Sequence, residues 1–206
     1  MKILELFAGS RSIGKAAEEL GMQVFSSDLI PFDGIHYVID IREFDIKKLP
    51  FVPDTIWASP PCTSFSVASI GNHWTGGKGA YIPKTESAIL GQELVLRTLE
   101  IINELKPKYW FIENPRGMLR KMPFMESLPI RNTITYCQYG DSRMKPTDIW
   151  TNCQKWIPRP SCKNGMPCHT SAPRGSRTGT QGLNGNYERS KIPHELCLEI
   201  LKSTQK

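Results

Sequence analysis

The chain has 206 residues, of which 39% are hydrophobic and 22% charged, and its formal net charge is +6 at pH 7. This length fits one ordinary domain with a substantial core, and the composition excludes both a disordered chain and a membrane-spanning one. Because the N-terminus lacks the long apolar stretch of a signal peptide, we expect a cytoplasmic protein whose six cysteines are thiols or metal ligands rather than disulfides.

Residues 1–150 alternate between strand-like and helix-like segments. Apolar and β-branched runs predict strands at 2–7, 23–28, 36–40, 55–59, 109–114 and 132–139. Helical patterns cover 12–20 and 90–105, and a short final helix follows Pro193. Because strands alternate with helices, the sequence predicts an α/β fold of three layers around a mostly parallel sheet.

Two segments break this alternation. Residues 70–88 are glycine-rich without a clear period, and a loop of this length is usually functional or mobile. Residues 151–192 carry seven Lys and Arg residues against one acid, Glu188, and are rich in Gly, Pro, Ser and Thr. Such a basic surface suits a phosphate backbone, but a merely solvated face is an equal alternative on charge alone.

Polar residues or glycine follow five predicted strands in succession. They are Gly9, Asp28, Asp40, Cys62 and the pair Glu113 and Asn114. Because ligands of open α/β sheets bind at the carboxyl ends of the strands, these residues would converge on one cleft. Taken singly, each also has a purely structural interpretation, as a tight turn or as a helix cap.

Cys62 has the most informative surroundings of the six cysteines. In the stretch "SPPCTSFS", Pro60 and Pro61 fix the backbone and hold the chain extended just past the fourth strand. Hydroxyl residues follow the sulfur within 63–66. A nucleophilic thiolate needs a polar, accessible setting, whereas a structural cysteine more often lies inside an apolar run. The pattern therefore indicates a nucleophile.

Three motifs, "LELFAGSRSIG", "SPPCTSFS" and "FIENPRGM", resemble in order and spacing those of the cytosine-C5 DNA methyltransferases. Members of that family carry a Phe-x-Gly loop, a Pro-Cys nucleophile and a Glu-Asn pair on a Rossmann-like sheet. The resemblance covers residues 1 to about 150 and, weakly, the final helix. It implies a Rossmann-like three-layer sandwich and methyl transfer from S-adenosylmethionine to C5 of cytosine in DNA.

The resemblance also implies roles for individual residues. Cys62 would attack C6 of a flipped-out cytosine, and Glu113 would contact N3 and the exocyclic amine. Arg143 and Lys145 would join these two as catalytic residues, although they match the family's Gln-x-Arg-x-Arg motif poorly. The cofactor contacts would be Phe7, Ala8, Gly9, Ser10, Arg11, Ser12, Asp28, Leu29, Asp40, Ile41 and Pro60. The substrate contacts would be Ser59, Pro61, Ser64, Ser66, Asn114 and Pro115.

The sequence departs from the family pattern in two glycine-rich loops. Arg11 stands where a second glycine is expected in the first of them. The 70–88 loop corresponds in position to the family's mobile catalytic loop, with Gly76, Gly77 and Gly79 as candidate hinges, or else is a passive surface insertion.

The segment 151–192 is far smaller than the family's usual recognition domain. It contains Cys153, Cys162, Cys168 and His169, spaced as C-x8-C-x5-C-H. Four such ligands in a short loop-rich segment predict a structural zinc ion that replaces a core, with unrelated thiols as the alternative. The stretch "APRGSRTGTQG" would then present Arg174 and Arg177 to DNA.

We therefore divide the chain into a catalytic core (1–150), a basic, zinc-stabilised recognition segment (151–192) and a C-terminal helix that packs back on the core (193–206). We expect a monomer, associated with the nucleoid of a prokaryotic or phage-infected cell, and the compact size fits a phage enzyme. Two alternatives remain open. One is the same reaction on RNA, and the other is a non-catalytic zinc-containing DNA-binding protein on a degenerate methyltransferase fold.

Overall fold

A seven-stranded sheet with the order β3-β2-β1-β4-β7-β9-β8 forms the centre of the computed structural model, which describes residues 1–67, 70–76, 81–171, 183 and 185–205. Its strands are β1 (Lys2–Leu6), β2 (Gln23–Asp28), β3 (Tyr37–Val38), β4 (Thr55–Ala58), β7 (Tyr109–Pro115), β8 (Ile130–Thr135) and β9 (Pro146–Thr151). The strands from β3 to β7 in this order pair in parallel, whereas β9 runs antiparallel to both β7 and β8. The prediction of a mostly parallel sheet is confirmed.

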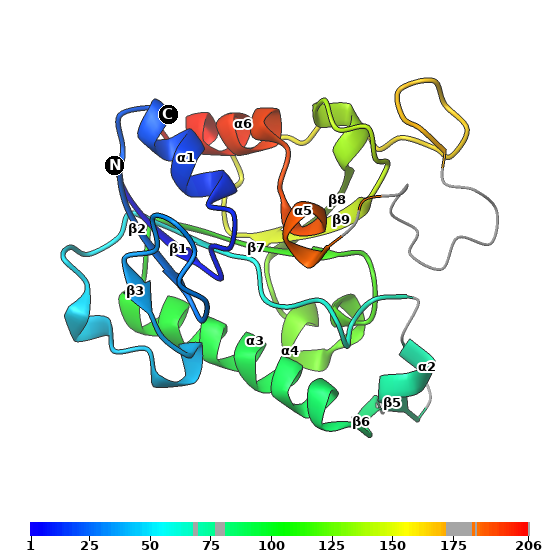
Figure 1. Ribbon diagram of the computed structural model, residues 1–206, viewed down its shortest axis with the longest axis horizontal. Helices are drawn as coiled ribbons and strands as arrows, with labels where there is room; N and C mark the ends of the chain where they lie inside the picture. Colours follow the sequence, from blue (N-terminus) through cyan, green and yellow to red (C-terminus); the bar gives the residue numbers. More distant parts are fainter. Residues whose placement is uncertain (68–69, 77–80, 172–182, 184, 206) are drawn as a thin grey trace.

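Helices cover both faces of this sheet (Figure 1). On one face lie α1 (Ser12–Glu19) and α6 (His194–Gln205), and on the other lie α3 (Glu86–Leu105) and α4 (Pro123–Glu126). Four short 3-10 turns complete this part of the chain: η1 (Ile41–Glu43), η2 (Ile46–Lys48), η3 (Leu119–Lys121) and η4 (Tyr136–Tyr139). The three-layer arrangement is therefore as predicted, and each face of the sheet buries its own apolar cluster.

The central strands are apolar because both of their faces are covered. All four residues of β4, "TIWA", are buried, as are the first six of β7, "YWFIEN". Parallel strands covered by helices on both sides typically show such continuous apolar runs instead of alternation. The polar residues that end β7 are therefore held at the edge of a rigid, fully packed layer.

The main differences between the predicted elements and the structure lie in four places. The predicted strand 132–139 stops at Thr135 and continues as η4, which ends at Gly140 with φ +83°. β9 was not predicted. The helix predicted from residue 90 begins at Glu86, because the Thr85 hydroxyl caps it by accepting the N–H of Ala88. The loop predicted at 70–88 contains α2 (Ile70–His73) and a hairpin of β5 (Trp74–Thr75) and β6 (Ile82–Pro83).

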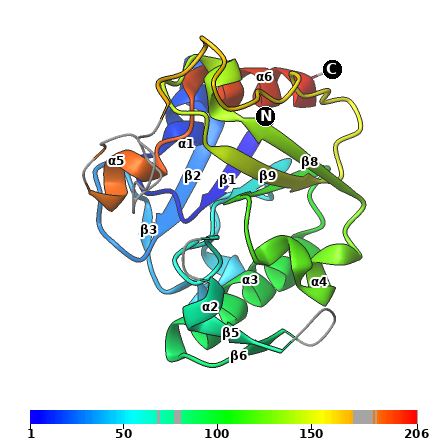
Figure 2. The same cartoon turned by 90° about the vertical axis from the view of Figure 1, so that its right-hand side faces the viewer.

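The hairpin and α2 lie beside α3, on the side of the molecule away from α6 (Figure 2). Trp74 of β5 is buried, stacks on Phe65 with ring centroids 5.6 Å apart, and donates its indole N–H to the carbonyl of Ser64. Of the proposed hinges, Gly76 has a left-handed φ of +88°, and Gly77 and Gly79 lie outside the described residues.

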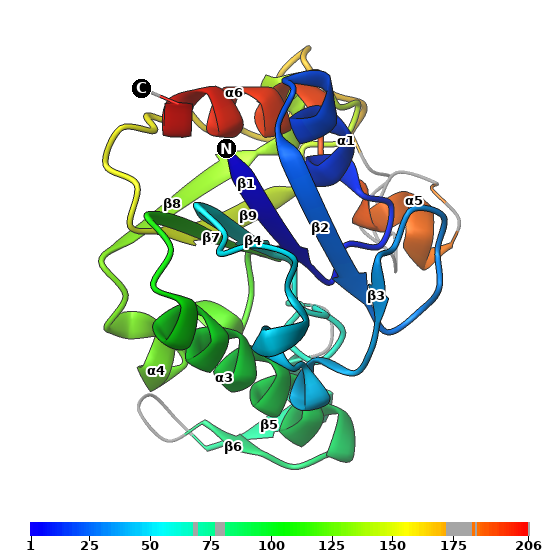
Figure 3. The same ribbon diagram turned by 90° about the vertical axis from the view of Figure 1, so that its left-hand side faces the viewer.

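After β9 the chain runs back over the core. Trp156 is buried against Phe111 of β7, and Arg159 pairs with Glu195 and Glu199 of α6. The chain then reaches α5 (Asn186–Ser190) and α6, which lies beside α1 so that both termini sit on one side of the molecule (Figure 3). Arg174 and Arg177 lie outside the described residues. Within the described chain, every helix is too short or too polar to span a bilayer.

Candidate active site

The loop after β4 carries Cys62. The carbonyl of Cys62 accepts the N–H groups of Phe65 and Ser66, both at 3.0 Å, so the chain turns sharply just after the two prolines. The Cys62 side chain stays partly exposed at this turn. The rigid approach through Pro60 and Pro61 and the turn after it together hold the sulfur at the end of β4.

The neighbouring strand β7 ends at the same edge and is tied to this loop. Ala58 pairs with Ile112, so Glu113 comes one residue past the last paired position. The Asn114 side chain donates from Nδ2 to the carbonyl of Pro60 at 2.8 Å. Asn114 is fully buried, and the prediction that it contacts a substrate is therefore corrected: it positions the Cys62 loop.

A second tie joins the same loop to the chain after β7. Phe65 offers its carbonyl to the N–H of Met118 at 2.6 Å, and Ser66 bridges to Gly117. A Cβ atom on Gly117 would lie 2.1 Å from the Phe65 oxygen, so only glycine permits this approach. Together with the Asn114 bond, this contact fixes the Cys62 loop against the strand end that carries Glu113.

Glu113 is only 5% exposed, and its partner is Tyr136 of η4. The Tyr136 hydroxyl donates to Glu113 Oε1 at 2.9 Å. Burial raises the pKa of Tyr136 well above its ordinary value, and the neighbouring Glu113 carboxylate raises it further, so the phenol keeps its proton and acts as the donor. Sequence reasoning did not find Tyr136, which lies inside a run typical of a strand.

Lys145 supplies positive charge at this site. Its Nζ atom lies 4.6 Å from the centroid of the Tyr136 ring and donates to the carbonyl of Arg189 at 3.2 Å. Burial raises the pKa of the Cys62 thiol, the charge of Lys145 opposes that rise, and the charge of Glu113 adds to it. Lys145 therefore favours the thiolate form that nucleophilic attack requires.

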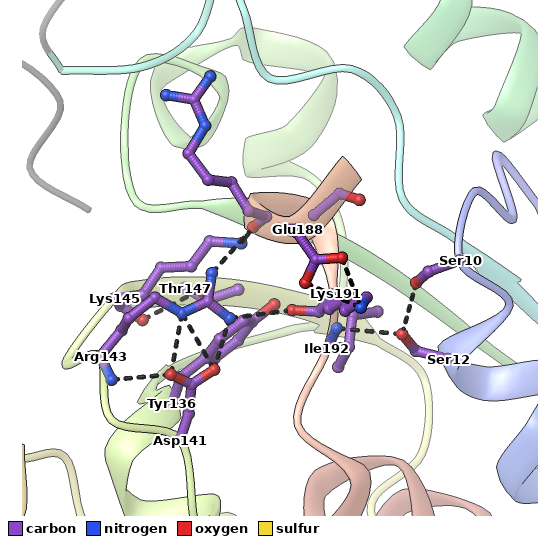
Figure 4. A network of polar contacts seen from close by, with 12 residues as sticks. Ser10, Ser12, Tyr136, Asp141, Arg143, Lys145, Thr147, Glu188, Lys191 and Ile192 are labelled. Carbon is purple, nitrogen blue, oxygen red and sulfur yellow. Dashed lines mark hydrogen bonds and ion pairs between the residues drawn. The ribbon is translucent and has the colours of Figure 1, made fainter. Parts of the chain in front are cut away.

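Arg143, the other cation predicted to be catalytic, is only 4% exposed and has a different role. It forms an ion pair with Asp141 and donates to the carbonyls of Arg189 and Lys191, at 3.1 and 3.3 Å. Figure 4 shows these contacts reaching from the turn after η4 to the end of α5. The prediction for Arg143 is corrected: its donors are occupied by the protein, and it anchors the segment that follows α5.

The loop between β1 and α1 has a strained backbone. Phe7, Gly9 and Arg11 have φ values of +55°, +49° and +55°, and two of these residues are not glycine. The N–H of Gly9 donates to Asp28 Oδ2 at 2.9 Å, and the other carboxylate oxygen accepts the N–H of Ile30. Among the described residues, a Cβ atom added to Gly9 would meet only Ser190 Oγ, at 3.9 Å, so they leave space beside the loop.

Arg11 is buried beneath this loop. Its Nε donates to Ser26 Oγ at 3.1 Å, and its guanidinium forms an ion pair with Glu18. The side chain also fills the space beside Gly34, where a Cβ atom would lie 2.5 Å from Nη1. The prediction of a cofactor contact is corrected for this side chain, and only the Arg11 backbone belongs to the loop.

Glu5 of β1 supports the loop from below. Its Oε1 accepts the N–H groups of Ile13 and Gly14, both at 3.1 Å, and its Oε2 accepts the Ser26 hydroxyl at 2.8 Å. Burial raises the pKa of Glu5 to about 7, although the Ser26 hydrogen bond and the charge of Arg11 act in the opposite direction. The start of α1 is thereby tied to β1.

Segment 185–192 covers one side of the same loop (Figure 4). The Ser12 hydroxyl contacts that of Ser10 at 2.9 Å and accepts the N–H of Ile192 at 3.1 Å. Tyr187 of α5 packs on Phe32 with ring centroids 5.4 Å apart. The end of the chain therefore completes a site that begins at its start, which the motif positions alone did not indicate.

The remaining predicted contacts divide between accessible and structural positions. Leu29 is 65% exposed, Ala8 is buried in the β1–α1 loop and Ile41 is buried in η1, where the Asp40 carboxylate caps the turn. Hydrogen bonding from Arg42 lowers the pKa of Asp40. Ser59 accepts the indole N–H of Trp57, Pro61 is exposed and Pro115 pairs with Thr147.

Ser64 is corrected as a substrate contact. Its side chain is buried against α3, where a Cβ atom on Gly91 would lie 2.6 Å from its Oγ. Its carbonyl accepts the Trp74 indole. Ser64 therefore belongs to the base of the Cys62 loop rather than to its open side.

The predicted metal ligands do not all meet. Cys162, Cys168 and His169 lie together, but their fourth neighbour is Cys137 of η4. Cys153 is buried in the core, with its sulfur 3.9 Å from Ser203 Oγ of α6, and the prediction that it binds metal was wrong. The physical reason is that β9 delivers Cys153 directly into the layer between the sheet and α6.

Known proteins share the sequence family and the fold of this chain. A family model described as "C-5 cytosine-specific DNA methylase" matches residues 1–139. A protein of Frog virus 3 (isolate Goorha), named "Probable DNA (cytosine-5)-methyltransferase", is 32% identical over 218 residues, which cover 98% of this chain and 99% of the viral protein.

Two solved structures share the fold at low sequence identity. A prophage-encoded E. coli protein described as a DNA modification methyltransferase aligns with a TM-score of 0.56 and 13% identity, over 80% of this chain and 52% of its own. The S. pombe Dnmt2 methyltransferase aligns with a TM-score of 0.51 and 15% identity, over 73% and 48%. The chain thus spans about half of each, and these likenesses establish the Rossmann-like methyltransferase fold.

Proposed function

The chain belongs to the C-5 cytosine-specific DNA methylase family, and we propose that it is a DNA (cytosine-5-)-methyltransferase acting on a flipped-out cytosine. The observation that carries the proposal is the pairing of two side chains on adjacent strand ends. Cys62 follows β4 and Glu113 lies in β7 just past its pairing with β4, and the Asn114–Pro60 hydrogen bond and the Gly117 contact hold the two segments together. A non-catalytic relative would have no need to keep both side chains in this setting.

The loop after β1 suits S-adenosylmethionine, which when bound supplies the methyl group. Its backbone is strained, the described residues leave space beside it at Gly9, and the Asp28 carboxylate stands at its side. An acid at the end of the second strand of such a sheet is placed to accept hydrogen bonds from ribose hydroxyls. Phe7, Ala8, Gly9, Ser10 and Ser12 would line the cofactor from the loop, with Asp40, Ile41 and Leu29 on the adenine side.

The chemistry requires a nucleophile and a hydrogen-bonding group at opposite parts of one ring. C5 of cytosine is a weak nucleophile, and addition of the Cys62 sulfur to C6 makes C5 enamine-like. Glu113 would carry a proton to N3, accept a hydrogen bond from the exocyclic amine, and so offset the negative charge that thiolate addition puts on the ring. Once C5 is methylated, a water molecule takes the C5 proton, the electrons of that C–H bond re-form the C5–C6 double bond, and Cys62 leaves as a thiolate, which restores the aromatic ring.

The burial of these groups supports extrusion of the base. Glu113 is 5% exposed, and Cys62 lies at the turn beside it. A cytosine stacked in a duplex cannot reach a carboxylate at this depth, so the target nucleotide would rotate out of the helix. We also propose that the enzyme acts as a monomer, which its elution volume in size-exclusion chromatography would test.

Transfer of labelled methyl groups from S-adenosylmethionine tests this proposal. We expect label in double-stranded DNA, recovered as 5-methylcytosine, and none with a Cys62→Ser variant of equal folded content. If label is recovered from RNA alone, the substrate is RNA rather than DNA. Absence of transfer to either polymer by the folded protein would contradict the proposal as a whole.

A further inference from the structure

Four side chains with soft or borderline ligand atoms, none of them in the Cys62 loop or in β7, meet in the structure. Cys137 comes from η4, whereas Cys162, Cys168 and His169 come from the segment after β9. Their sulfur atoms and one imidazole nitrogen all lie within 4.8 Å of one another. The cluster therefore joins two parts of the chain that are separated by a whole strand.

The spacing of these atoms matches a tetrahedral zinc site. Zn–S bonds of about 2.3 Å and Zn–N bonds of about 2.0–2.1 Å place two sulfurs about 3.8 Å apart, and a sulfur and a nitrogen about 3.5–3.6 Å apart. The sulfurs of Cys137 and Cys168 are 3.8 Å apart, and His169 Nδ1 lies 3.6 Å from the sulfurs of both Cys162 and Cys168. Three of these edges thus have the expected length.

A fourth distance, between the sulfurs of Cys162 and Cys168, excludes a covalent bond between them. Cys162 and Cys168 are separated by 3.1 Å, which is shorter than a tetrahedral edge but much longer than a disulfide bond of about 2.05 Å. All six cysteines are free thiols in this structure. The two sulfurs are therefore not bonded to each other, and binding of zinc would move them apart to the tetrahedral separation.

Backbone hydrogen bonds hold the ligands on both sides of the cluster. The N–H of Cys162 donates to the Thr135 hydroxyl at 2.8 Å, and the N–H of Thr170 donates to the carbonyl of Ser142 at 2.9 Å. Gln138 donates from its amide to the Cys168 sulfur at 3.5 Å, the kind of contact that stabilises a thiolate ligand. These three hydrogen bonds hold the segment 162–170 against η4 and the residues next to it, with the sulfur atoms between them.

The segment that supplies three of these ligands has little apolar core of its own. Ile157 is 82% exposed and Met166 is 52% exposed, so its larger apolar side chains do not bury one another. Short segments of this kind are commonly stabilised by a bound metal ion. A site of three sulfurs and one imidazole in tetrahedral order favours zinc among the divalent metals.

We propose that Cys137, Cys162, Cys168 and His169 bind one structural zinc ion, which cross-links the segment after β9 to η4. The site has a direct connection to the reacting groups. Cys137 adjoins Tyr136, whose hydroxyl donates to Glu113. If the proposed function holds, the ion also positions Tyr136 for the reaction, because it fixes the short turn η4 from which that side chain projects. This part of the inference rests on the proposed function.

Metal analysis of the purified full-length protein tests the site without any reference to activity. We expect one zinc per chain in the wild type, and well under half of that in Cys137→Ser and in Cys168→Ser. The matched controls are Cys153→Ser and Cys197→Ser, which replace buried cysteines outside the cluster and should keep the zinc. Cys168 is exposed, so its variant tests the site even where a change at the buried Cys137 prevents folding.

Three results would overturn the proposal. They are a wild-type zinc content well below one per chain, full zinc in folded Cys168→Ser, and a mass 2 Da lower than expected that maps to a Cys162–Cys168 disulfide. Replacement of the ion by cobalt provides a second readout, since the tetrahedral site should give thiolate-to-cobalt absorption that the Cys137→Ser and Cys168→Ser variants lack. Zinc without methyl transfer would leave this site standing and contradict only the proposed function.

Discussion

Replacement of Tyr136 by Phe removes the hydroxyl that donates to Glu113 and that also forms a hydrogen bond with Thr147. The hydroxyl donates to Glu113 Oε1 at 2.9 Å in a buried setting, and the ring packs under Lys145 with 4.6 Å between the ring centroid and Nζ. Phenylalanine keeps the aromatic ring and lacks only the hydroxyl group. Hydrogen bonds to charged groups contribute about 1.5–3 kcal/mol, which corresponds to a roughly 10- to 150-fold change in rate.

We therefore expect kcat/KM of Tyr136→Phe for cytosine methylation to fall by about one to two orders of magnitude, because Glu113 loses the group that orients it. Single-turnover methyl transfer to a duplex oligonucleotide measures this change. Tyr139→Phe is the matched control: it removes a hydroxyl from the same turn, and that hydroxyl accepts the N–H of Arg159 and does not contact Glu113. The reasoning is refuted if folded Tyr136→Phe retains kcat/KM within twofold of the wild type, or if Tyr139→Phe loses as much.

Three further perturbations test separate parts of the structure. Lys145→Gln removes the charge that opposes the rise in the Cys62 pKa, so the pH–rate profile of methyl transfer should move to higher pH, and an unmoved profile would contradict this role. Arg120→Met leaves Asp148 fully buried without its ion-pair partner and should lower the free energy of unfolding by about 3–5 kcal/mol, measured by urea denaturation; a loss below about 1 kcal/mol would count against it. The pKa of Glu5 is about 7 in the folded protein, above its ordinary value of 4.5. Between these two pH values the folded protein therefore binds more protons than the unfolded chain. The contribution of Glu5 to stability is full below pH 4.5 and is lost as the pH rises through 7. At 1.36 kcal/mol per pKa unit the loss is about 3 kcal/mol, and Glu5→Gln should lack this pH dependence in unfolding experiments at pH 4.5 and pH 8; equal slopes for both proteins would exclude it.

The sequence was sufficient to predict the parallel strands of the sheet, although not β9, and to place Cys62 and Glu113 at neighbouring strand ends. Apolar runs such as "TIWA" and "YWFIEN" mark central strands because both of their faces are covered by helices. The polar residues after such strands then fall at one edge by the geometry of parallel pairing. The nucleophile and its carboxylate partner could be placed together without coordinates for this reason.

Contacts between segments distant in the sequence could not be predicted in the same way. Tyr136 lies in the run "TITYCQY", whose composition is typical of a strand, and the change to η4 depends on the turn that Gly140 makes with its φ of +83°. The metal ligands were sought within residues 151–192 by their spacing. Cys137 was missed because only the folded chain brings η4 against the segment after β9, whereas Cys153 enters the core.

Predicted site residues whose side chains turned out to be structural share one property. Arg11, Arg143 and Asn114 are all polar residues that the fold buries, so each must find partners inside the protein. Arg11 pairs with Glu18, and Asn114 binds the Pro60 carbonyl. Burial cannot be read from a motif position, and a motif residue that supports the site looks the same in sequence as one that touches a ligand.

The close contact at Gly117 limits which residues can occupy position 117 during evolution. The Phe65 carbonyl, 2.1 Å from where a Cβ atom would stand, cannot retreat, because the N–H of Met118 already holds it. In a library randomised at position 117, we expect selection for activity to return glycine alone. Within the described part of the chain, Gly71 has no heavy atom within 4 Å of its added Cβ atom, and there the same selection should accept many residues. A glycine that takes no part in the chemistry would then be as intolerant of mutation as the nucleophile itself.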